Sequence, residues 1–117
     1  MILAVLDDLM FSSKIRTAAA HLNQPLVFAR SEASALAELK KGGTTLVVLD
    51  LNNPRTNPMG IVTAMKADPA LADVRTVAYA SHVEADLMAT ARAAGVDAVL
   101  PRSAFSAGLA DILAGAR

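Results

Sequence analysis

The 117-residue chain contains no cysteine, which excludes a disulfide framework and any metal site built on thiolates. This absence is compatible with a reducing cytoplasm, which is the location we expect. The sequence also lacks an excess of charge, because 11 Lys and Arg residues balance 11 Asp and Glu residues. A chain without net charge has no overall field that attracts nucleic acid or a membrane surface, so we expect neither as a partner.

Long hydrophobic runs are missing as well, although 54% of the residues are hydrophobic. The apolar run at the N-terminus reaches only Leu6 before two aspartates interrupt it, so it is neither a signal peptide nor a membrane span. The sequence has no glycine-rich phosphate loop, no HExxH motif and no convincing spacing of Ser, His and Asp for a catalytic triad.

Short apolar runs do recur along the chain, and each is typical of a strand buried on both faces. Segments with helical periodicity separate them, and five such β-then-α units predict an α/β fold with a doubly wound, five-stranded parallel sheet. The common strand order for five strands is 2-1-3-4-5. The length fits one domain, 1–117. The predicted strands are 2–6 (ILAVL), 26–29 (LVFA), 45–50 (TLVVLD), 75–80 (RTVAYA) and 97–100 (DAVL).

Capping residues and proline set the expected helix starts. The last helix is predicted to end at about Ala114, and we expect no output domain in this chain. The predicted helix starts are at Ser12 or Ser13, Ser31, Pro58, Ser81 or His82, and Ser103.

Three aspartates stand where predicted strands end. Asp7 and Asp8 follow the first strand, and Asp50 ends the third. In the order 2-1-3-4-5 the ligand crevice lies beyond the carboxyl ends of these two strands, so the three carboxylates are expected to converge. Like charges at close range repel unless a cation or proton joins them, and Mg²⁺ prefers oxygen ligands. Each aspartate alone could instead form a turn or cap a helix.

Three segments resemble the receiver domain of two-component response regulators, and the resemblance extends over essentially the whole chain. The segment VLDD at 5–8 is similar to the acidic pair of that family. The segment LVVLDLNNP at 46–54 is similar to the family's phosphoacceptor strand and the loop that follows it. The segment around the fifth strand resembles AAGVDAVLPRS at 93–103. The resemblance implies the flavodoxin-like receiver fold, in agreement with the strand pattern.

The resemblance also implies roles for the residues of the acidic pocket. Asp50 would be the phosphoacceptor and a ligand of Mg²⁺. The same ion would be held by Asp8, by Asp7 through water, and by the backbone carbonyl of Asn52. The phosphoryl group would come from a histidine kinase or a phosphotransfer protein, and the signal would pass by contact to a downstream protein. Apart from self-phosphorylation from a phosphodonor and self-dephosphorylation, we expect no enzymatic activity.

Several positions depart from the family pattern. Ala80 stands where the family usually has Thr or Ser at the end of the fourth strand. The adjacent Ser81 could supply the missing hydroxyl only if the strand register shifted by one residue. Arg102 replaces the usual Lys, and its planar fork differs from a point charge on a flexible stem. Val99 stands at the position of the aromatic switch residue.

Two interpretations therefore stay open. The three aspartates favour a phosphorylatable receiver. The altered positions favour a pseudo-receiver, which is a protein-interaction module that works without phosphorylation. A flavin-binding protein or another small doubly wound enzyme is a third class, but two negative charges after the first strand would repel a flavin phosphate. In a receiver, the surface that contacts the downstream protein would lie within residues 84–114.

Overall fold

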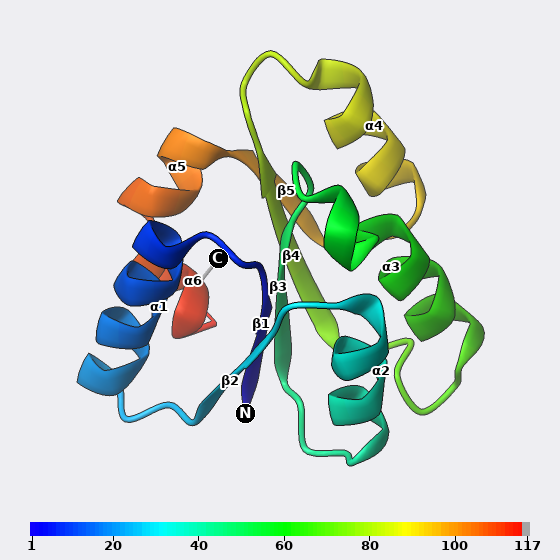
Figure 1. The fold of residues 1–117 in the computed structure, drawn as a ribbon, viewed down its shortest axis with the longest axis horizontal. Helices are drawn as coiled ribbons and strands as arrows, with labels where there is room; N and C mark the ends of the chain where they lie inside the picture. The colour runs from blue at the N-terminus through cyan, green and yellow to red at the C-terminus, as the bar shows by residue number, and fades with distance from the viewer. Residues whose placement is uncertain (116–117) are drawn as a thin grey trace.

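The sheet has five parallel strands in the order β2-β1-β3-β4-β5 (Figure 1), which confirms the predicted topology. The computed structural model describes residues 1–115. Ala116 and Arg117, which the expected domain included, lie outside the described residues. The strands are β1 (Ile2–Val5), β2 (Leu26–Ala29), β3 (Leu46–Asp50), β4 (Arg75–Ala80) and β5 (Ala98–Pro101).

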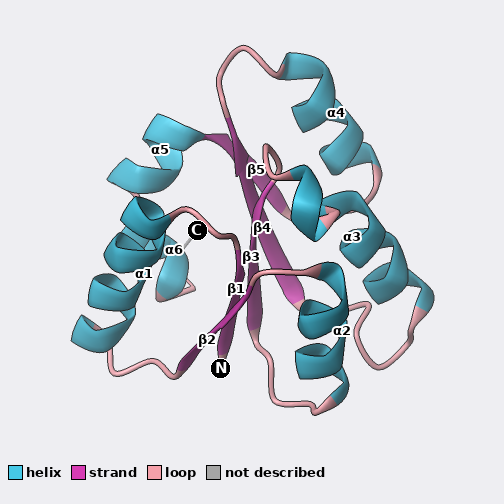
Figure 2. Ribbon diagram, in the orientation of Figure 1, coloured by secondary structure: helices cyan, strands magenta, loops and turns pink. Residues whose placement is uncertain are grey.

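Helices cover both faces of the sheet (Figure 2). On one face lie α1, α5 and α6, and on the other lie α2, α3 and α4. None of the helices within residues 1–115 combines the length and apolar character needed to cross a bilayer. The helices are α1 (Leu9–His21), α2 (Glu32–Lys40), α3 (Pro58–Ala67), α4 (Ala85–Ala93), α5 (Arg102–Ala107) and α6 (Leu109–Leu113), with a 3₁₀ turn, η1, at Pro54–Thr56.

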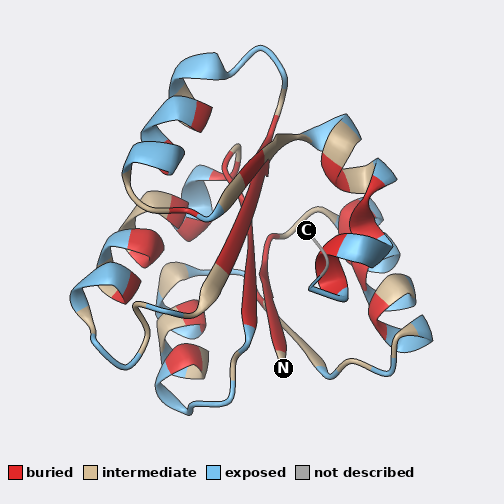
Figure 3. Cartoon of the chain, turned by 180° about the vertical axis from the view of Figure 1, so that it is seen from behind, coloured by how far each residue is buried: buried red, intermediate tan, exposed pale blue. Residues whose placement is uncertain are grey.

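Each face of the sheet has its own apolar core, because successive strand residues point to opposite sides. In β3, Val47 and Leu49 pack with α2, α3 and α4, whereas Leu46 and Val48 pack with α1, α5 and α6. Figure 3 shows buried strands at the centre of the sheet and exposed outer faces of the helices, and the edge strands β2 and β5 are mostly of intermediate burial. Burial on both sides explains why the strand sequences are continuous apolar runs rather than alternating ones.

Several predicted helix starts were wrong. The first helix begins at Leu9, because the carboxylate of Asp8 caps it, and Ser12 is buried within its second turn. The fourth helix begins only at Ala85, since a turn precedes it in which the Glu84 N–H donates to the Ser81 carbonyl. The predicted starts at Ser31 and Pro58 were correct to within one residue.

The final helical segment is also divided, which the sequence analysis did not predict. It begins at Arg102 without a side-chain cap, so Ser103 is not the capping residue. The segment breaks at Gly108, which separates α5 from α6. Both short helices still bury apolar side chains against the same face, including Phe105 and Ile112.

Candidate functional site

An open depression of about 520 Å³ lies beyond the carboxyl ends of β1 and β3. It occupies the edge at which the strand order reverses, the place where ligands bind in open α/β sheets. Three carboxylates were expected to meet there from the order of the strands, and all three line the depression. Its lining consists of Asp7, Asp8, Asp50, residues 52–55 and Arg102.

Asp50 is the buried acid of this pocket, with 5% of its surface exposed. Its Oδ1 accepts a hydrogen bond of 2.9 Å from the backbone N–H of Asn52. Burial raises the pKa of Asp50, and the negative charges of Asp8 and Asp7 add to that effect. The Asn52 hydrogen bond and the positive charge of Arg102 oppose the rise in pKa. A cation in the pocket would therefore favour the charged form of Asp50.

Asp8 has a structural role in addition to its place in the pocket. Its Oδ1 accepts hydrogen bonds from the backbone N–H groups of Met10 at 2.9 Å and Phe11 at 3.1 Å, and so caps α1. A carboxylate at this position also complements the positive end of the helix dipole. Capping occupies only Oδ1 among the described contacts, so Oδ2 of Asp8 remains available to a ligand.

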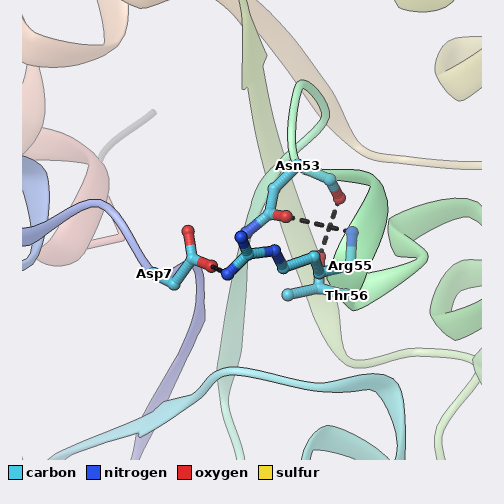
Figure 4. A network of polar contacts seen from close by, with 4 residues as sticks. All are labelled: Asp7, Asn53, Arg55 and Thr56. Carbon is cyan, nitrogen blue, oxygen red and sulfur yellow. Dashed lines mark hydrogen bonds and ion pairs between the residues drawn. The ribbon is translucent and has the colours of Figure 1, made fainter.

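The third carboxylate, Asp7, faces a cation from the opposite wall of the pocket. The Arg55 guanidinium extends from η1 and lies 3.6 Å from Oδ2 of Asp7 (Figure 4). Arg55 is 82% exposed, and exposed ion pairs contribute little to stability. This contact partly neutralises the pocket without closing it.

The loop between β3 and α3 is fixed by its own asparagines. Asn53 accepts a hydrogen bond of 3.0 Å from the Arg55 N–H, and the hydroxyl of Thr56 donates to the Asn53 carbonyl at 3.2 Å (Figure 4). Asn57 adopts a left-handed conformation, with φ of 47°, and caps α3. Asparagine side chains commonly form such local turns, and the dense turn residues of this loop were the available sequence signal.

One contact of this loop reaches the loop after the neighbouring strand and was not predicted. Oδ1 of Asn52 accepts a hydrogen bond of 2.7 Å from the backbone N–H of Ser81, just after β4. The bridge joins the loops that follow β3 and β4. It also occupies a backbone donor that would otherwise be available at the rim of the pocket.

The remaining predicted site residues are divided between a second cavity and the core. Ser81 lines a neighbouring cavity of about 330 Å³ with His82, Pro101, Arg102 and Ser103. Arg102 therefore lines both depressions. Ala80 lines neither of them, because its side chain is fully buried in the core beneath α2, α3 and α4.

Arg102 also lies over aromatic rings, a contact that the sequence analysis missed. Its guanidinium carbon is 5.4 Å from the ring centre of Phe11 and 5.9 Å from that of Tyr79. Tyr79 is fully buried, and its hydroxyl has no hydrogen-bond partner among residues 1–115. Burial, followed by the charge of Asp50, raises the pKa of Tyr79, so the phenol stays neutral.

The donor set of the pocket fits a hard divalent cation, because carboxylate and carbonyl oxygens are available and nitrogen or sulfur ligands are not required. Within residues 1–115, however, no three Asp, Glu, His or Cys side chains lie close enough to hold a metal as they stand. The ligand set Asp7, Asp8, Asp50 and Asn52 stays a prediction.

Neither a protein-family model nor a curated protein sequence matches the chain. Solved structures do match. A response regulator from Hahella chejuensis is 22% identical, with a TM-score of 0.86, and the match covers 97% of this chain and 91% of that one. The chain has the receiver fold.

Two further structures with this fold are similar over the same extent. The phosphorylated cyanobacterial phytochrome response regulator RcpA is 24% identical with a TM-score of 0.80, and the Mn²⁺-bound form of the response regulator Rcp1 is 24% identical with a TM-score of 0.74. Each match covers 97% of this chain and 88% of the other. The receiver-like fold expected from the sequence is therefore confirmed.

Proposed function

We propose that this chain is a two-component receiver that accepts a phosphoryl group on Asp50. The observation that carries the proposal is the position of Asp50, a buried carboxylate at the switch point of the sheet, in one pocket with Asp7, Asp8 and Arg102. Solved structures with the same fold are response regulators, and one of them is phosphorylated.

The chemistry is a phosphoryl transfer in which the protein supplies the nucleophile. A carboxylate oxygen of Asp50 attacks phosphorus as the bond from phosphorus to the donor breaks, and the electron pair of that bond leaves with the donor. With phosphohistidine the leaving atom is an imidazole nitrogen, which takes up a proton. In self-dephosphorylation, water attacks the same phosphorus, Asp50 leaves as carboxylate, and inorganic phosphate carries away the proton.

Asp7, Asp8, Asp50 and the carbonyl of Asn52 are the residues that would hold Mg²⁺. When bound, the ion would neutralise charge on the carboxylates and on the transferred oxygens. Arg102 also lines the pocket, and its guanidinium can bind phosphoryl oxygens in a bidentate manner. The Mn²⁺-bound form of the response regulator Rcp1, which has the same fold, supports the binding of a divalent cation.

The proposed phosphodonor is a histidine kinase or a phosphotransfer protein, and the signal passes to a further protein. Two neighbouring apolar side chains that directly follow Asp8 support a protein partner: Leu9 and Met10 at the start of α1 are 73% and 72% exposed. Adjacent exposed apolar side chains beside a polar site are suited to contact another protein. We place this function in the cytoplasm, with which the absence of cysteine is compatible.

A pseudo-receiver is the second candidate, and two observations favour it. Ala80 offers no hydroxyl to a phosphoryl group, and the Asn52 side chain occupies the backbone N–H of Ser81. In that case the fold would bind its partner without phosphoryl transfer, and the acidic pocket would be an inactive remnant.

Incubation with acetyl phosphate and Mg²⁺, followed by intact mass measurement, distinguishes the two candidates. We expect the wild type to gain the mass of one phosphoryl group and Asp50→Asn to gain none. Asp111→Asn, which removes an exposed carboxylate of α6, is the matched control and should react like the wild type. A wild type that stays unmodified, also with a panel of histidine kinases, would support the pseudo-receiver.

A further inference from the structure

Three of the four aromatic residues of the chain form a single cluster directly behind the acidic pocket. The rings of Phe11 and Tyr79 meet edge to face at 5.1 Å, and those of Tyr79 and Phe105 stack at 4.5 Å. All three side chains are buried between the sheet and the helices α1, α5 and α6. Such geometry keeps the ring planes in fixed orientations.

The cluster is next to the proposed phosphoacceptor. Asp50 and Tyr79 are paired residues on the adjacent strands β3 and β4. Paired residues on neighbouring strands point to the same face of a sheet, so the Tyr79 ring lies on the same side as the Asp50 carboxylate. Phe11 is brought to the same place by α1, whose start is fixed by the Asp8 cap.

Arg102 rests on this aromatic surface. Its guanidinium lies 5.4 Å from the Phe11 ring centre and 5.9 Å from that of Tyr79, and within residues 1–115 it has no carboxylate at ion-pair distance. An exposed arginine without an ion pair would otherwise adopt many rotamers. The two ring faces are therefore what restricts the guanidinium to a position between the two depressions that it lines.

We propose that Phe11 and Tyr79 are positioning residues, whose ring faces hold the Arg102 guanidinium beside Asp50, where it binds phosphoryl oxygens. This inference rests on the proposed phosphorylation of Asp50. It also explains why arginine can replace lysine here, because a planar guanidinium stacks on aromatic rings and a compact, strongly hydrated ammonium group does so less well. In this chain lysine would not be a conservative substitute.

A double-mutant cycle on the rate of phosphorylation tests the proposal. We expect Phe11→Leu to lower the second-order rate constant with acetyl phosphate by about two- to fivefold, the range for one exposed cation–π contact. In an Arg102→Gln background the same change should have little effect, because no guanidinium remains to be positioned beside Asp50. The Lys14 ammonium also lies over the Phe11 ring, 5.5 Å from its centre, but Lys14 lines neither of the two depressions. Phe11→Tyr retains the ring and should restore the rate, and Arg102→Lys should react more slowly than the wild type.

The chain provides a matched control for the loss of a ring under an arginine. The Arg16 guanidinium lies 5.1 Å from the ring centre of Phe28 on β2, a strand that does not line the pocket. Phe28→Leu should leave the phosphorylation rate unchanged. A rate loss for Phe11→Leu of equal size with Arg102 and with Gln at position 102 would show a purely structural role and overturn the proposal.

A spectroscopic measurement tests the contact without any phosphodonor. Tyr79 is the only tyrosine and the chain has no tryptophan, so its near-ultraviolet absorption and fluorescence report on a single ring. Removing the cation in Arg102→Gln should shift this signal, whereas Arg16→Gln should not. An unshifted signal would contradict the stacking itself. If Arg102→Gln shifts the signal but the wild type is never phosphorylated, the proposed function would be contradicted instead.

Discussion

Burial is the main cause of the altered pKa of Asp50, because this residue ends a strand that is buried along its whole length. Its pKa in the folded protein is raised above the ordinary value of 3.8. The folded state therefore binds a proton more readily than the unfolded state does. Protonation of Asp50 favours folding at low pH, and this contribution is lost as the pH rises through the raised pKa. At neutral pH the charged carboxylate destabilises the fold.

We therefore expect Asp50→Asn to increase the free energy of unfolding at pH 7. The amide keeps an oxygen for the Asn52 N–H but removes the buried charge. The advantage of the variant should decrease as the pH falls toward 3.8, the ordinary carboxyl value. Urea unfolding at a series of pH values measures it, with Asp111→Asn as control. A variant that is less stable than the wild type at pH 7 would show that the charge is already compensated.

Among the helices, α1 links local structure to the site, because Asp8 both caps it and lines the pocket. Two substitutions separate these roles. Asp8→Asn retains a capping oxygen and should leave stability nearly unchanged, whereas Asp8→Ala should cost about 0.5–2 kcal/mol. Both variants should weaken Mg²⁺ binding in titration calorimetry. If Asp8→Asn bound Mg²⁺ as well as the wild type, Asp8 would be only a cap.

The same helix shows what the sequence could and could not predict. The strands were predictable, since burial on both faces requires continuous apolar runs. The start of α1 could not be predicted from the sequence, because Asp8, Ser12 and Ser13 are all suitable capping residues. Which of them caps the helix depends on where β1 ends. The acidic pocket followed from topology. The contact of Arg102 with Phe11 could not be predicted from topology, because it depends on side-chain packing between residues far apart in the sequence.

For the molecule as a whole, we expect phosphorylation to produce a limited conformational response. A bound group shifts a two-state equilibrium only by its differential interaction with the two states, and Ala80 supplies no hydroxyl for one of them. The missing hydrogen bond would contribute roughly 1.5–3 kcal/mol, which is a bias of about ten- to a hundredfold. NMR spectra with beryllofluoride and Mg²⁺ should change mainly near Asp50.

Two substitutions at the same buried position isolate the hydroxyl. Thr and Val have nearly the same shape, so Ala80→Thr and Ala80→Val fill the core alike and differ in the hydrogen-bonding group. We expect spectral changes to extend to α4 and β5 in Ala80→Thr, and to stay local in Ala80→Val. A wild-type response that already reaches α4 and β5 would show that other residues carry the switch.

Because each face of the sheet has its own core, a change at the site can reach the helices of either face separately. Ala80 faces the core beneath α2, α3 and α4, whereas the preceding residue, Tyr79, faces the core beneath α1, α5 and α6. If Arg102 moved, the rings beneath it would first displace α1, α5 and α6, which lie on the opposite face of the sheet from α4. Ala80 supplies no hydroxyl on one side of the sheet, and Arg102 rests on aromatic rings on the other. We therefore expect phosphorylation of Asp50 to act on α1, α5 and α6 rather than on α4.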